Sequence, residues 1–99
     1  MCTQDIKITI AELLKTQPVE KAWLFGSFAR GEETKDSDVD ILVRYDGNAR
    51  ITLMTISRMM GALERAIQRP VDLIEEGCLL PFAEATVNRD KILIYERNA

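Results

Sequence analysis

The sequence contains no histidine, and this absence removes several kinds of active site from consideration. Catalysis by a histidine general base, zinc sites built on histidine and serine-histidine-aspartate triads are all excluded. The two cysteines, Cys2 and Cys78, are too far apart in sequence for a C-x-x-C metal or redox site and too few for a disulfide framework. Any chemistry must therefore use carboxylates, hydroxyls, lysine, arginine or the backbone.

Basic residues are also too few and too scattered for a nucleic-acid surface. Thirteen lysines and arginines stand against sixteen acids, giving a net charge of -3, whereas a protein that binds nucleic acid without sequence preference usually carries a basic stripe. No apolar run approaches the ~18 residues of a membrane span, and the N-terminus lacks the pattern of a secretory signal. We therefore expect a cytoplasmic protein with neither a nucleic-acid nor a membrane partner.

The chain is short and its composition does not change along its length. These 99 residues predict one domain that spans residues 1–99. A chain of this size buries a little more than ~60% of the surface that its unfolded form exposes, which is enough for one core but not for a separate substrate-binding module. A large substrate must therefore supply its own binding surface.

Hydrophobic periodicity and turn residues predict an alternation of helices and strands. Helices are expected over residues 6–14, 51–67 and 82–87. Strands are expected over residues 21–25, 39–45, 71–74 and 91–95, with a polar loop over residues 31–37. This alternation predicts an α/β (α+β) protein with a small mixed β-sheet of about four strands flanked by helices, although it does not reveal the strand order.

Two aspartates stand at the start of the expected strand 39–45. Asp38 and Asp40 are two positions apart, and residues so spaced on a strand point to the same face with Cα atoms ~6.6 Å apart. Two ionised carboxylates this close repel each other unless solvent or a cation lies between them. Mg²⁺ suits this position because it prefers oxygen ligands, takes one or two carboxylates and completes its shell with water and substrate phosphates.

A third aspartate opens the expected strand 71–74. If this strand lies next to strand 39–45, Asp72 can complete an acidic cluster with Asp38 and Asp40. The residues Val39, Ile41 and Val43 alternate with the acids and are expected to pack into the core. The pattern thus identifies Asp38, Asp40 and Asp72 as candidate metal ligands and catalytic residues.

A glycine and a serine end the expected strand 21–25. Gly26 lets the backbone approach a phosphate closely, and Ser27 offers a hydroxyl and an N–H near a helix start, where the helix dipole favours anions. Arg30 adds a positive charge one helical turn later. A Gly-Ser pair alone occurs in many turns. It indicates a phosphate site here because two aspartates follow it at short range.

The combined pattern resembles a known family. The run Gly26-Ser27-x-x-Arg30-Gly31, followed by Ser37-Asp38-x-Asp40 and a later isolated Asp72, is similar to the signature of the DNA polymerase β-like nucleotidyltransferase superfamily. The resemblance is to its smallest members, the minimal nucleotidyltransferase (MNT) domain proteins, and covers nearly the whole chain. It implies the nucleotidyltransferase fold and the transfer of a nucleoside monophosphate, expected to be AMP from ATP, with the help of two Mg²⁺ ions.

The resemblance also implies a role for each matched acid. Asp38 and Asp40 would ligate the metal ions. Asp72 would ligate a metal ion or act as the base for the acceptor hydroxyl. All three acids of the family pattern are intact in this chain.

Nucleotide and partner roles follow from the same resemblance. Gly26 and Ser27 would hold the triphosphate, and Arg30 would contact a phosphate or anchor the loop. Members of this family pair with HEPN-domain toxins, so the resemblance implies a hetero-oligomer. In it, this chain would act as an antitoxin by placing AMP on a tyrosine hydroxyl of the toxin.

Each motif also has a plainer interpretation. Asp38 and Asp40 could form a solvated turn, Asp72 could be an exposed acid, and Ser27 could be a helix N-cap. Methionines 54, 59 and 60 are typical of a core or a partner interface rather than a cofactor site. Two other functions stay open: an antitoxin that occludes its toxin without catalysis, and a catalytic subunit that modifies a small molecule together with a separate substrate-binding chain.

Overall fold

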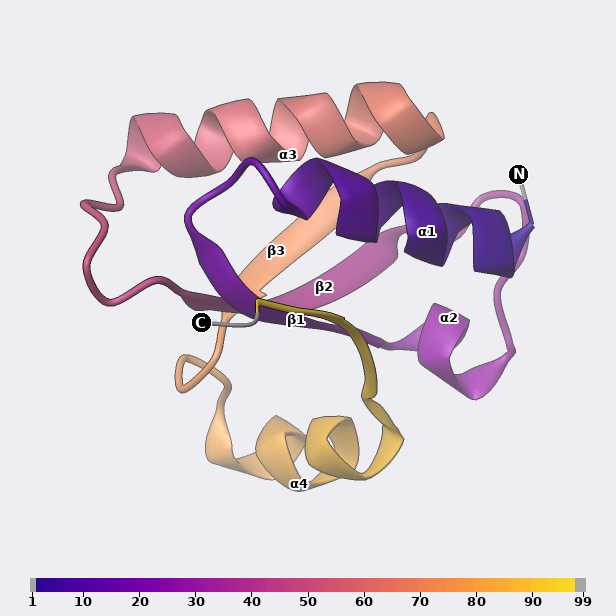
Figure 1. Cartoon of the computed structure of the whole chain (residues 1–99). Helices are drawn as coiled ribbons and strands as arrows, with labels where there is room; N and C mark the ends of the chain where they lie inside the picture. The colour runs from indigo at the N-terminus through magenta and orange to yellow at the C-terminus, as the bar shows by residue number, and fades with distance from the viewer. Residues whose placement is uncertain (1, 98–99) are drawn as a thin grey trace.

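Residues 2–97 are described by a computed structural model, in which helices alternate with strands (Figure 1). In chain order the elements are α1 (Thr3–Leu14), β1 (Val19–Phe25), α2 (Ser27–Arg30), β2 (Val39–Tyr45), α3 (Leu53–Ile67), β3 (Val71–Glu75), α4 (Pro81–Asp90) and β4 (Ile92–Glu96). The four strands form one sheet, which confirms the predicted α/β class and the predicted small mixed sheet.

The strand order of the sheet is β3-β2-β1-β4. β1 runs antiparallel to both of its neighbours, β2 and β4, whereas β2 and β3 are parallel. Parallel neighbours need a crossover between them, and α3 supplies it. The strand that carries Asp72 therefore lies directly beside the strand that carries Asp40, an adjacency that the sequence left open.

The helices α1 and α3 cover one face of the sheet (Figure 1). Their buried side chains recur every three or four positions and meet alternate residues of β2, namely Val39, Ile41 and Val43, as predicted. The helical contributors are Ile6, Ile10, Leu14, Met59, Leu63 and Ile67. Full burial of one such side chain stabilises the fold by roughly 1.5–3 kcal/mol. No helix within residues 2–97 is long and apolar enough to cross a membrane.

Among residues 2–97, α4 is the one helix on the opposite face of the sheet (Figure 1). Trp23, Phe25 and Leu42 form a smaller buried group there, and Leu79 and Val87 pack against it. α4 itself contributes no fully buried residue. Part of this face is thus left open to solvent, and Asp40 projects from it because it alternates with the core residues of β2.

Some element boundaries differ from the predicted ranges. A helix start was expected near Ser27, and α2 begins there, but no helix range was predicted because four residues are too few to show helical periodicity. α3 begins two residues later than expected, since Thr52 forms its N-cap: the Thr52 hydroxyl accepts the Thr55 N–H at 3.2 Å in a capping box. The helix ends at Gln68, which has a left-handed backbone with φ of 56°, shortly before Pro70.

Candidate active site

Two of the predicted acids meet across neighbouring strands. Asp40 on β2 and Asp72 on β3 are register partners in the parallel pair, so their side chains leave the same face of the sheet. Asp40 is half-buried and Asp72 is exposed. The structure therefore brings these two carboxylates together at the open face, although 32 positions separate them in the sequence.

Burial and negative charge act on Asp40. The pKa of the Asp40 carboxyl is raised from 3.8 to about 6, first because burial disfavours its charged form. The negative charges of Asp72 and then Asp38 raise this pKa as well, whereas the positive charge of Arg30 opposes them. A cation bound among these acids would favour the ionised form and displace the proton.

Asp38 lies at the end of the loop, one residue before β2 begins. Its side chain is exposed, and its charge reaches Asp40. Within residues 2–97, no three acidic or cysteine side chains converge closely enough to enclose a metal ion by themselves. The site therefore consists of the Asp40–Asp72 pair with Asp38 beside it. This donor set fits Mg²⁺, which takes one or two carboxylates and obtains its other ligands from water and phosphates.

Gly26 lies against the carboxylate of Asp40. Its φ of 71° and ψ of -149° fall in a region that is almost exclusive to glycine. A Cβ atom at this position would overlap Oδ2 of Asp40 and would lie 3.2 Å from its Cγ. The sequence predicted a glycine that admits a phosphate. In the structure, its missing side chain also makes room for the most buried of the three acids.

The other two predicted phosphate ligands lie on α2. Ser27 is the first residue of this short helix, and Gly26, not Ser27, is its N-cap. The plainer interpretation of Ser27 as an N-cap is therefore wrong. Arg30 ends the helix, and its Nε donates a 2.6 Å hydrogen bond to Glu32. Ser27 follows directly on the glycine that lies against Asp40, and Arg30 stands at the other end of the same four-residue helix, so α2 borders the acidic pair.

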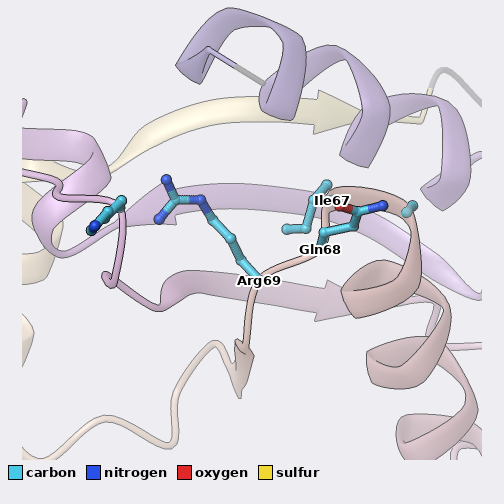
Figure 2. Close-up of a pocket in the computed structure, with 5 residues that line it drawn as sticks. Ile67, Gln68 and Arg69 are labelled. Carbon is cyan, nitrogen blue, oxygen red and sulfur yellow. The ribbon is translucent and has the colours of Figure 1, made fainter.

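Sequence reasoning missed one residue near this site, Arg69. A cavity of about 430 Å³ lies between the end of α3 and the loop before β2, and Figure 2 shows Arg69 reaching across it from the turn after α3. Its lining residues are Lys35, Ala66, Ile67, Gln68 and Arg69. The only local signal was an arginine before Pro70, which marks the end of a helix but does not indicate a partner.

The chain is similar in sequence and fold to known proteins. Residues 8–99 match the family described as polymerase beta, nucleotidyltransferase. The chain belongs to the polymerase β-like nucleotidyltransferase family. This nucleotidyltransferase is 34% identical over 77 residues to a Methanocaldococcus jannaschii protein provisionally named a protein adenylyltransferase, a match that covers 77% of each chain. It is 32% identical over 83 residues to protein adenylyltransferase MntA of Thermococcus cleftensis, covering 84% of this chain and 82% of the relative.

Solved structures agree with the family membership of this nucleotidyltransferase. A structure provisionally described as a minimal nucleotidyltransferase superposes with a TM-score of 0.76 at 30% identity, covering 93% of this chain and 95% of the other. The fold also matches, with a TM-score of 0.70 at 18% identity, a complex of a tri-AMPylated Shewanella oneidensis HEPN toxin with an MNT antitoxin. That match covers 97% of this chain and 74% of the other. The chain is thus an enzyme of the nucleotidyltransferase class.

Proposed function

We propose that this chain is a Mg²⁺-dependent protein adenylyltransferase that moves AMP from ATP onto a protein hydroxyl. The observation that carries the proposal is the pairing of Asp40 with Asp72 on one open face of the sheet. The names of its relatives, which include protein adenylyltransferases of two archaea, support the choice of AMP and of a protein acceptor.

The three acids are proposed to hold the metal. Asp40 and Asp72 are the fixed ligands, and the exposed Asp38 adds a third carboxylate. When bound, Mg²⁺ neutralises the charge of the triphosphate and of the transition state. The acceptor oxygen bonds to the α-phosphorus while the bond to pyrophosphate breaks. The hydroxyl proton passes to a carboxylate, and Asp72 is the candidate because it is more exposed than Asp40.

Gly26, Ser27 and Arg30 are proposed to bind the triphosphate. Backbone N–H groups at the start of a helix have no partner inside the helix, and no side chain caps α2. The Ser27 hydroxyl and the Arg30 guanidinium add a donor and a positive charge on the same short segment. These groups border the acidic pair, as a nucleotide that bridges them requires.

The proposed acceptor is a tyrosine of a HEPN-domain toxin, which would make this chain an antitoxin in a hetero-oligomer. The support is the structural similarity to the MNT antitoxin that was solved with a tri-AMPylated HEPN toxin. Leu80 and Phe82, at the start of α4, are 60% and 81% exposed and provide apolar surface for a protein partner. Both lie on the side of the sheet from which the aspartates project.

The test is transfer of label from each of the four NTPs to a co-purified partner in the presence of Mg²⁺. We expect adenylate on the partner, detected as added mass on a tyrosine peptide. Asp40→Asn and Asp72→Asn should abolish the transfer, while Asp36→Asn, in the same loop but outside the acidic pair, should retain it. A partner that is silenced equally well by Asp40→Asn would instead identify an antitoxin that acts by occlusion.

A further inference from the structure

Arg69 connects the loop that carries Asp38 to the turn that precedes Asp72. Its Nη1 donates hydrogen bonds to the carbonyl oxygens of Thr34, at 2.9 Å, and Ser37, at 3.0 Å. We propose that Arg69 is a positioning residue that holds Asp38 beside the Asp40–Asp72 pair, so that the Asp38 charge stays close to a cation bound by that pair. The inference rests on the proposed function, because it requires these acids to be metal ligands.

Asp38 needs such an anchor because it lies outside the sheet. Asp40 and Asp72 are held by the hydrogen-bond ladder between β2 and β3, whereas Asp38 precedes β2 in a segment without regular structure. Hydrogen bonds between Thr34 and Ser37 close a turn in this segment, but they do not attach it to the rest of the protein. The Thr3 hydroxyl attaches the start of this segment by donating to Glu33 at 2.7 Å, and Arg69 attaches its end at the residue next to Asp38.

The turn from which Arg69 projects is itself held firmly. The N–H of Val71 donates to the Glu64 carboxylate at 2.9 Å, and the carbonyl of Pro70 accepts the N–H of Val39 at 2.9 Å. Gln68 closes the helix with a hydrogen bond to the carbonyl of Glu64. A fixed turn allows the long Arg69 side chain to define the position of the loop.

An arginine suits this role better than a lysine. Its planar guanidinium stacks 5.1 Å from the ring centroid of Phe28 while its edge bonds both carbonyls. Both hydrogen bonds of Arg69 go to backbone carbonyls of the loop, so Arg69 acts on the site through the position of the loop. Partners of this kind that orient metal ligands typically contribute 10–100-fold to metal affinity.

The test compares Arg69→Met with a matched arginine at the other end of β2. Arg97 also ties a loop, because its Nη1 donates to Asp46 at 3.1 Å and its Nη2 to the carbonyl of Gln17. Methionine keeps an apolar stem over Phe28 but has no donor. The affinity for Mn²⁺, a paramagnetic substitute for Mg²⁺, is measured by electron paramagnetic resonance together with the thermal stability of each variant.

We expect Arg69→Met to raise the Mn²⁺ Kd about 10-fold, and Arg97→Met to change it less than about twofold at similar loss of stability. Transfer activity of Arg69→Met should return as the Mg²⁺ concentration is raised, which a merely structural defect would not produce. Arg69→Lys should show an intermediate Kd, because an ammonium keeps the donors but not the planar stack. If Arg69→Met does not fold, Arg69→Lys is the variant used in the test.

The outcomes separate this inference from the proposed function. Wild-type Mn²⁺ affinity in Arg69→Met, or in Arg69→Lys where the former does not fold, would overturn the role of Arg69 and leave the acids as metal ligands. An equal loss of affinity in Arg97→Met would overturn it as well. Wild-type affinity in Asp40→Asn would overturn the proposed function, and the inference with it.

Discussion

Asp40 and Asp72 occupy paired positions on the parallel strands β2 and β3, and Asp40 lies in a space that opens only because residue 26 is glycine. Two acids of like charge and a glycine-only backbone conformation are thus concentrated at one point of the sheet. The repulsion between the two acids opposes folding of the metal-free protein, whereas glycine adopts its conformation here without steric cost. Such repulsion is expected where a bound cation compensates for it.

Replacement of Asp40 by asparagine should stabilise the metal-free protein while ending transfer. The amide keeps the shape of the side chain but removes a charge that is disfavoured by burial and by Asp72. We expect a gain of about 1 kcal/mol at pH 7, a value already reduced for solvent screening because Asp40 is only half-buried. Transfer should fall on the order of 10³-fold. Urea denaturation and a transfer assay measure the two effects, and a loss of stability in Asp40→Asn would contradict the prediction.

The raised pKa of Asp40 also predicts how the free energy of unfolding depends on pH. Because the folded-state pKa of Asp40 is raised from 3.8 to about 6, the metal-free folded protein holds this proton more tightly than the unfolded chain. The stability that the protonated Asp40 contributes is fully present below pH ~4 and is lost as the pH rises through about 6. The gain from Asp40→Asn should therefore be near zero at low pH and complete by pH ~7. A gain that does not vary across this range would exclude the raised pKa.

Gly26→Ala and Gly31→Ala compare two glycines that share a φ of 71° but differ in ψ, which is -149° at Gly26 and 23° at Gly31. A Cβ at Gly26 would overlap the Asp40 carboxylate, whereas a Cβ at Gly31 would meet nothing within 4 Å. We expect Gly31→Ala to cost about 1 kcal/mol of unfolding free energy and Gly26→Ala at least ~2 kcal/mol more. Thermal denaturation of both variants measures the difference. Equal losses would mean that neither the overlap with Asp40 nor the backbone conformation of Gly26 adds a cost.

The carboxylate of Glu64 is predicted to stabilise the start of β3 as a hydrogen-bond acceptor rather than through its charge. It accepts the N–H of Val71, the residue before Asp72, at 2.9 Å. Glu64→Gln keeps an acceptor oxygen and should change the unfolding free energy by less than about 0.5 kcal/mol. Glu64→Ala leaves the buried N–H without a partner and should cost about 1–3 kcal/mol. Similar stabilities of the two variants would show that this hydrogen bond contributes little.

Local features of this protein were predictable from the sequence because they depend on neighbouring positions. Alternation along residues 39–45 assigns Val39 and Ile41 to the core and Asp40 to the opposite face, and the structure confirms the burial of these core positions. The spacing of the apolar residues likewise predicted α1 and α3 to within three residues of their observed starts. The motif that relates Asp38 and Asp40 to a nucleotidyltransferase is equally local, which is why the family could be predicted from the residues alone.

Contacts between distant segments were decided only by the tertiary structure. Asp72 lies beside Asp40 because the crossover through α3 makes β3 the parallel neighbour of β2, and no local pattern encodes strand order. The overlap between Gly26 and Asp40 and the hydrogen bonds from Arg69 to the loop before β2 likewise join residues whose separation in sequence carries no periodic signal. The sequence by itself thus determined which groups can perform the chemistry. The packing of the sheet decided which of them meet, because that packing minimises the free energy of the whole chain at once.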